Sequence, residues 1–229
     1  MGKTVPLTRP DGRTLEGFLA GSGDGAPGVV VIQEWWGLND QIRGVAERLA
    51  AAGYVALVPD LYRGKATVDA EEAHHLMSGL DFLDAAQQDV RAAAQYLRTA
   101  GCPKVGVTGF CMGGALTVLS AVHVPEADAA VVWYGYPPVE LVDASRIRAA
   151  MLAHWATQDQ FFTLEGVDAL EGKLRDARVA YTGYRYLAHH AFANETAQGP
   201  RRLPATAYDA HWAQTAWDRT MRFFGRHLG

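Results

Sequence analysis

The sequence of 229 residues contains little cysteine. Its two cysteines, Cys102 and Cys111, lie at the ends of a segment that we expect to be extended. Nine residues at about 3.3 Å each separate them by more than about 20 Å, whereas a disulfide needs Cα atoms within about 7 Å. We therefore expect two free thiols, as in a reducing compartment.

Long hydrophobic runs and an excess of positive charge are also lacking. No stretch approaches the roughly 18 apolar residues of a membrane span, and residues 1–6 have no signal-peptide core. The net charge of −4 comes without a basic cluster, which argues against a nucleic-acid partner. No His-Glu-x-x-His spacing is present for a metal. We therefore expect a cytoplasmic protein with no membrane, nucleic-acid or metal partner.

Strands and helices alternate along the chain, and 49% of the residues are hydrophobic. This alternation is typical of an α/β fold in which helices cover both faces of a mostly parallel sheet, with the active site beyond the carboxyl ends of the strands. No linker rich in proline, glycine or serine divides the chain, so we expect one domain over 1–229. Residue patterns predict strands at 4–8, 13–20, 28–34, 54–59, 104–110, 129–134, 149–156 and 180–187, and helices at 40–52, 83–99, 163–178 and 208–228.

The segment Gly109-Phe110-Cys111-Met112-Gly113-Gly114 joins a predicted strand to an apolar helix. Glycines two residues either side of Cys111 allow a sharp turn, as in the nucleophile elbow of the α/β-hydrolases, here with a thiol in place of the usual hydroxyl. The following helix directs its N-terminal N–H groups at the reacting centre. Cys111 is therefore the candidate nucleophile, although a turn that buries a small apolar cysteine would read the same way.

A thiol nucleophile needs a base, and the base needs an acid that orients it. In the α/β-hydrolase order the acid follows the nucleophile and the histidine comes last. Asp159 follows the strand predicted at 149–156, and His189 and His190 follow the strand predicted at 180–187. Other histidines, such as His154 within a strand, are better explained as structural.

Four ordered segments resemble the dienelactone hydrolase family: Gln33–Gly37, Gly53–Tyr62, Gly109–Gly114 and His190–Phe192. The resemblance implies the α/β-hydrolase fold, no metal or cofactor, and a Cys-His-Asp triad. It assigns the nucleophile to Cys111, the acid to Asp159 and the base to His190, because the family histidine precedes a small residue and phenylalanine. The implied activity is hydrolysis of activated esters or lactones, small-molecule substrates, through an acyl-thioester.

The resemblance also carries over Glu34, the equivalent of a family glutamate that gates the thiol. A carboxylate beside a thiol can hold it protonated until substrate displaces the acid. The oxyanion hole implied by the elbow consists of the backbone N–H groups of Met112 and Trp35.

The predicted substrate pocket is apolar and aromatic. In the family that the chain resembles, arginines hold the carboxylate of the lactone. This chain has no arginine around Ala70–Leu76, where the first is expected, and has Asn194 at the second position, so the dienelactone itself is not the expected substrate. A non-hydrolytic reactive-thiol protein, such as a redox or electrophile sensor on the same fold, is the alternative, and the oligomeric state is left open. The candidate pocket residues are Trp36, Phe110, Tyr134, Phe161, Phe192 and Asn194.

Overall fold

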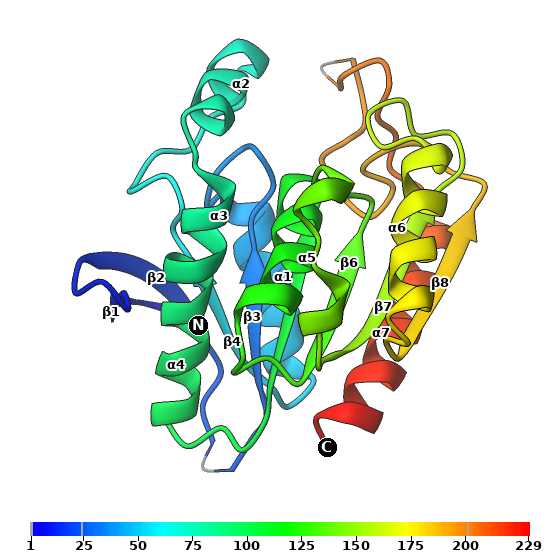
Figure 1. Cartoon of the computed structure of the whole chain (residues 1–229). Coiled ribbons are helices and arrows are strands. Elements are labelled where there is room, and N and C mark those ends of the chain that lie inside the picture. The colour runs from blue at the N-terminus through cyan, green and yellow to red at the C-terminus, as the bar shows by residue number, and fades with distance from the viewer. Residues whose placement is uncertain (1, 24, 201) are drawn as a thin grey trace.

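The computed structural model describes residues 2–23, 25–200 and 202–229, and its centre is one eight-stranded sheet. The strand order is β1-β2-β4-β3-β5-β6-β7-β8 (Figure 1). The strands are β1 (Lys3–Thr8), β2 (Thr14–Ala20), β3 (Gly28–Ile32), β4 (Val55–Pro59), β5 (Val105–Phe110), β6 (Ala129–Trp133), β7 (Ala150–Ala156) and β8 (Tyr181–Tyr186). Each lies within about two residues of the strand predicted from the sequence.

Pairing within the sheet is mostly parallel. The hairpin strands β1 and β2 pair antiparallel, and β2 pairs antiparallel with β4. All pairs from β4 through β3 to β8 are parallel. Six strands therefore end at the same edge, where loops can bring together side chains that are distant in sequence.

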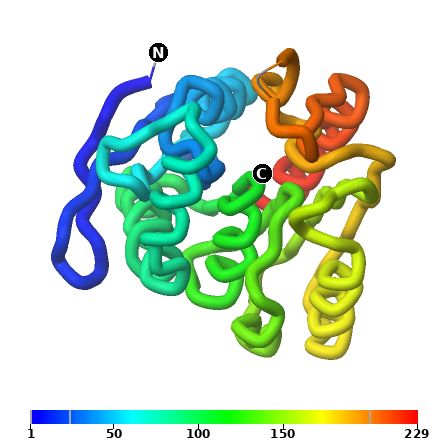
Figure 2. Tube along the Cα trace, turned by 90° about the horizontal axis from the view of Figure 1, so that it is seen from above, coloured from blue at the N-terminus to red at the C-terminus, as the bar shows by residue number. Residues whose placement is uncertain are grey.

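Helices cover both faces of this sheet. Figure 2 shows α1 and α7 on one side and α4, α5 and α6 on the other. The main helices are α1 (Asp40–Ala51), α2 (Ala70–Ser78), α3 (Phe82–Asp84), α4 (Arg91–Thr99), α5 (Met112–His123), α6 (Leu164–Asp176) and α7 (Ala210–His227).

Alternation along the buried strands divides the core between the two faces. In β3, Val29 and Val31 pack towards α1 and α7, whereas Val30 and Ile32 pack towards α4 and α5. In β5, Phe110 joins the α1 and α7 side. Five consecutive buried residues in β3 are what a strand covered on both faces requires.

The helix predicted over 83–99 is interrupted. The short helix α3 runs into a π-helical segment, Ala85–Val90, before α4 begins at Arg91. This segment buries Asp89, whose carboxylate accepts hydrogen bonds from Arg63 at 2.9 and 3.0 Å. Among the described residues no helix is long and apolar enough to cross a membrane.

Candidate active site

Cys111 lies at a strained turn between β5 and α5. Its φ of 55° and ψ of −117° form a conformation that costs a residue with a side chain about 1–3 kcal/mol. Glycines allow the neighbouring backbone to close around it: a Cβ on Gly113 would lie 2.5 Å from the carbonyl oxygen of Ile32, and one on Gly135 would overlap that of Cys111. The thiol is free, as is that of Cys102, which confirms the prediction for both cysteines.

Asp159 and His190 meet at the edge next to this turn, 31 residues apart in sequence. The Nδ1 atom of His190 lies 2.7 Å from Oδ2 of Asp159. The other oxygen, Oδ1, accepts hydrogen bonds from the backbone N–H groups of Phe161 at 2.8 Å and Phe162 at 3.0 Å. The carboxylate therefore has a fixed orientation, and it orients the imidazole in turn.

The imidazole of His190 is enclosed by aromatic rings and by negative charge. Phe162 stacks on it at 5.6 Å between ring centroids, and Tyr134 meets it edge-on at 5.1 Å. Burial alone would lower the pKa of His190, but the charge of the Cys111 sulfur, together with hydrogen bonds to Asp159 and Cys111, raises it to about 10. An imidazolium is thus stabilised beside the sulfur. The neighbouring His189 is half-buried, and its Nδ1 is enclosed without a hydrogen-bond partner among the described residues.

Glu34 lies on the same edge, beyond β3, but its carboxyl group is held by two other residues. The Nδ2 amide of Asn194 donates to Oε2 at 2.6 Å, and the Tyr134 hydroxyl donates to Oε1 at 3.3 Å. Asn194 is itself oriented, because its Oδ1 accepts from the backbone N–H of Thr196 at 2.9 Å. Burial raises the pKa of Glu34, against the attraction of His190 and these two hydrogen bonds.

Among the described residues, two backbone N–H groups at this edge of the sheet have no protein acceptor. Met112 is the first residue of α5, so its N–H has no intrahelical acceptor. Trp35 lies in the turn after β3, and within the described residues neither N–H donates to a protein group. The Met112 side chain is buried and accepts a hydrogen bond from the Tyr62 hydroxyl at 3.2 Å, which fixes the start of the helix.

The aromatic residues predicted for the pocket divide into two groups. Phe110, Tyr134 and Phe192 are at most 3% exposed and pack in the core beneath the site, so they support its polar groups and do not line its entrance. Trp36 is half-buried and meets Trp35 edge-on at 4.8 Å.

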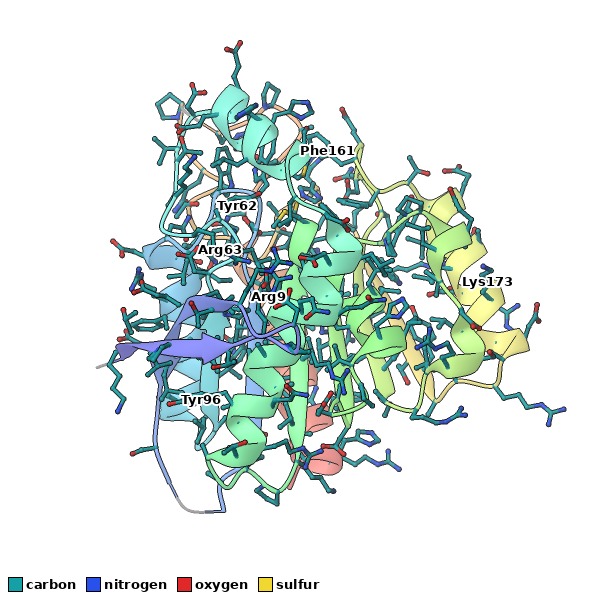
Figure 3. All side chains as sticks on the ribbon, turned by 60° about the vertical axis from the view of Figure 1, so that its left-hand side comes forward. Arg9, Tyr62, Arg63, Tyr96, Phe161 and Lys173 are labelled. Carbon is teal, nitrogen blue, oxygen red and sulfur yellow. The ribbon has the colours of Figure 1, made fainter. Side chains whose placement is uncertain are left out.

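Phe161 is the exposed member of the predicted set. It is 52% exposed and lies at the same end of the molecule as Tyr62 (Figure 3). Its ring meets His190 edge-on at 5.0 Å between centroids, which places it at the entrance to the site.

Sequence reasoning missed the supporting residues Phe162 and Thr196. The turn signal of Asp159 was visible, because aspartate commonly accepts hydrogen bonds from the backbone two residues on. No sequence signal indicated that Phe162 would stack on a histidine. In the part of the chain that the structure describes, no group of three potential ligands is arranged for a metal.

Known proteins with similar sequences and structures share this architecture. A family model described as the dienelactone hydrolase family matches residues 15–228. Protein usf of Aquifex pyrophilus is 34% identical over 242 residues, which cover 100% of both sequences. The crystal structure of a dienelactone hydrolase-like promiscuous phosphotriesterase from metagenomic libraries is 26% identical, with a TM-score of 0.80 over 100% of this chain and 99% of that one. A propionate-bound thermophilic esterase of Thermogutta terrifontis, 16% identical with a TM-score of 0.73 over 98% and 94%, shares the fold.

The order of the strands, the helices on both faces and the match over residues 15–228 agree with one another. The sheet is that of the α/β-hydrolase fold, as the sequence predicted. The protein is a hydrolase that belongs to the dienelactone hydrolase family.

Proposed function

We propose that residues 1–229 act as a single-domain, cysteine-dependent hydrolase of activated esters or lactones, with Cys111 as nucleophile, His190 as base and Asp159 as the acid that orients it. The observation that carries the proposal is the fixed His190–Asp159 pair. Its 2.7 Å hydrogen bond leaves Nε2 of the imidazole for the sulfur, and the elbow conformation of Cys111 presents the sulfur above the sheet edge.

Acylation follows from this arrangement. The Cys111 thiolate attacks the ester carbonyl carbon, and the carbonyl π electrons move to oxygen. The N–H groups of Met112 and Trp35 stabilise that oxyanion. When the carbonyl re-forms, the carbon–oxygen bond to the leaving group breaks, and the imidazolium of His190 protonates the departing alkoxide or enolate.

Deacylation reverses the roles. Neutral His190 removes a proton from water, and the resulting hydroxide attacks the thioester carbon. The Cys111 thiolate then leaves, the acid product is released, and the thiolate again lies beside the His190 imidazolium. Because a thiolate leaves a tetrahedral intermediate easily, substrates with good leaving groups are acylated well. Ordinary alkyl esters return to starting material and turn over slowly.

The charge around the site favours uncharged substrates. The charged groups that act most strongly on Glu34, Tyr134 and His190 are the His190 imidazolium, the Cys111 sulfur, Glu34, Asp159 and Glu195. The His190 imidazolium is the cation among them, and the Cys111 sulfur and Asp159 already balance its charge, so a carboxylate on the substrate would meet repulsion without a cation of its own.

Two chromogenic esters of equal acyl length test this preference. p-Nitrophenyl valerate and p-nitrophenyl hydrogen glutarate share a five-carbon acyl chain, but the glutarate carries a terminal carboxylate. We expect kcat/KM to favour the valerate at least about tenfold, corresponding to about 1.4 kcal/mol. Equal values of kcat/KM would contradict the assigned substrate class but would not bear on the assignment of Cys111 as nucleophile.

The nucleophile is tested by intact-protein mass spectrometry after brief exposure to p-nitrophenyl acetate. We expect one acetyl adduct that maps to Cys111 while nitrophenolate release continues. Cys111→Ala should abolish both signals, and Cys102→Ala, a change at the buried second thiol, should leave both intact. Hydrolysis retained by Cys111→Ala would refute the proposal, whereas an adduct that never clears would favour the reactive-thiol alternative.

A further inference from the structure

The helices α1 and α7 lie on the face of the sheet opposite α4, α5 and α6 (Figure 2), and residues of both helices line a slot. Its volume is about 290 Å³. Phe110 and Trp133 form its buried floor, with their rings stacked at 5.0 Å between centroids. Trp217 of α7 and Tyr208 from the preceding loop form one side. The interior is therefore aromatic and large enough for about one ring with a short substituent.

Small residues keep this slot open. Gly44 lies in the middle of α1, and no heavy atom lies within 4 Å of where its Cβ would be. Glycine inside a helix costs about 1 kcal/mol relative to alanine, and here neither packing nor a positive φ requires it. Ala213 of α7 lines the same slot. Gly44 is exposed and lines the slot, so a long side chain at position 44 has room to reach over its opening.

Arg48 supplies positive charge one helical turn after Gly44. Its guanidinium lies 3.9 Å from the centroid of the Trp217 ring and donates to Oε1 of Gln214 at 3.0 Å. Among the described residues Arg48 forms no ion pair within 4.0 Å, although Asp218 and Glu195 attract it at longer range and Gln214 bridges it to Asp218. Burial lowers the pKa of Arg48, a cost that a bound anion would offset.

Glu195 also lines the slot and carries negative charge. It is exposed, in the loop after Asn194, so solvent screens it. Its presence nevertheless disfavours ligands with more than one negative charge.

We propose that this slot is a second binding site, for a small planar aromatic monocarboxylate. The ring lies between the half-buried Tyr208 and Trp217, above the buried edges of Phe110 and Trp133, and the carboxylate accepts hydrogen bonds from Arg48. The slot is distinct from the proposed catalytic site, but two of its lining residues adjoin that site. Phe110 directly precedes Cys111, and Ala193 follows His190 in the same loop. Such acids are also the products released when esters with an aromatic acyl group are hydrolysed.

Phenylacetate and its uncharged analogue phenylacetamide are suitable probes. Binding is measured by ligand-observed saturation-transfer NMR on protein whose Cys111 has been carbamidomethylated, so neither catalysis nor an open thiol is required. Failure of the proposed hydrolase function would leave this experiment unaffected. We expect phenylacetate to bind the alkylated and unmodified proteins equally.

Three variants separate the slot from other sites. Gly44→Leu fills the slot with a good helix former, and we expect at least a tenfold loss of phenylacetate affinity. Gly44→Ala, which raises helix propensity equally without filling the space, should lose less than twofold. Arg48→Met keeps the aliphatic stem and should weaken phenylacetate at least tenfold while leaving phenylacetamide within twofold.

Several results would overturn the proposal. Unchanged affinity in Gly44→Leu would place the ligand elsewhere, and loss of binding on carbamidomethylation would place it in the catalytic site. No phenylacetate signal at about 10 mM, the weak end of specific binding, would show that the slot takes no such acid.

Discussion

Replacement of Asp159 by asparagine puts a hydrogen-bond donor where the proposed site has an acceptor, at nearly the same size and shape. The variant side chain keeps an oxygen that can accept from the backbone N–H groups of Phe161 and Phe162, so the turn is retained. Its amide N–H₂ then faces Nδ1 of His190, where the carboxylate oxygen lies 2.7 Å away in the native protein. A donor in that place forces Nδ1 to accept, and the ring proton moves to Nε2. The imidazole can then no longer take a proton from the thiol or from water.

The expected loss follows from this tautomer change. Asparagine at the acid position of a Ser-His-Asp triad lowers kcat about 10⁴-fold, and a thiol, which ionises more readily, should lose less. We expect a loss of about 10²–10⁴ in kcat, or about 3–5 kcal/mol of transition-state stabilisation. Folding stability should fall by only about 1.5–3 kcal/mol, the value of one hydrogen bond to a charged group.

The assay is p-nitrophenyl acetate hydrolysis, combined with histidine ¹⁵N NMR to identify the tautomer. Asp143→Asn is the matched control, because Asp143 also accepts from a backbone N–H two residues on, at 3.2 Å, but is exposed and outside the site. It should retain full activity. An Asp159→Asn enzyme within about fivefold of the native rate, with its tautomer changed, would refute the assigned role of the imidazole.

Three further changes test the electrostatics and the turn. Carbamidomethylation of Cys111 removes the charge that raises the pKa of His190, so that pKa should fall well below about 10 when followed by NMR. Burial lowers the pKa of His154 to about 3, so the unfolded chain binds more protons between pH 3 and 6.5, and stability is lost as pH falls through that window; His154→Gln should flatten a plot of Tm against pH there. Gly135→Ala should cost about 1–3 kcal/mol in urea unfolding, because its Cβ would overlap the Cys111 carbonyl, whereas Gly172→Ala, with no atom within 4 Å, should not destabilise.

The sequence was sufficient for the sheet and for the residues that meet at its edge. Buried parallel strands are continuous apolar runs that can be recognised in the sequence. The loops after such strands all lie at the carboxyl edge of the sheet. That is why Asp159 could be predicted to lie near His189 and His190, whereas the choice of His190 came from the family resemblance; the structure joins Asp159 to His190 at 2.7 Å. The strained turn at Cys111 followed from the spacing of glycines.

Features that depend on side-chain packing could not be predicted. The aromatic residues expected at the mouth include Phe110 and Phe192, which are buried, because the face to which a side chain at the end of a strand points depends on the local turn. The π-helical segment Ala85–Val90 contains neither glycine nor proline, and its burial of Asp89 depends on an arginine 26 residues earlier, Arg63. The spacing of apolar residues alone therefore predicts a continuous helix over this stretch.

Glu34 shows how a long-range contact changes an interpretation based on resemblance. The gating role requires its carboxylate to reach the thiol, yet both of its oxygens accept hydrogen bonds, from Asn194 160 residues away and from Tyr134. Both donors are buried, and leaving one without an acceptor costs about 1–3 kcal/mol. A movement of Glu34 onto Cys111 therefore has to be compensated by a ligand that accepts from those donors. Until such a ligand binds, Glu34 stays with Asn194 and Tyr134 and His190 is the group beside the sulfur, so the gating role requires a bound substrate.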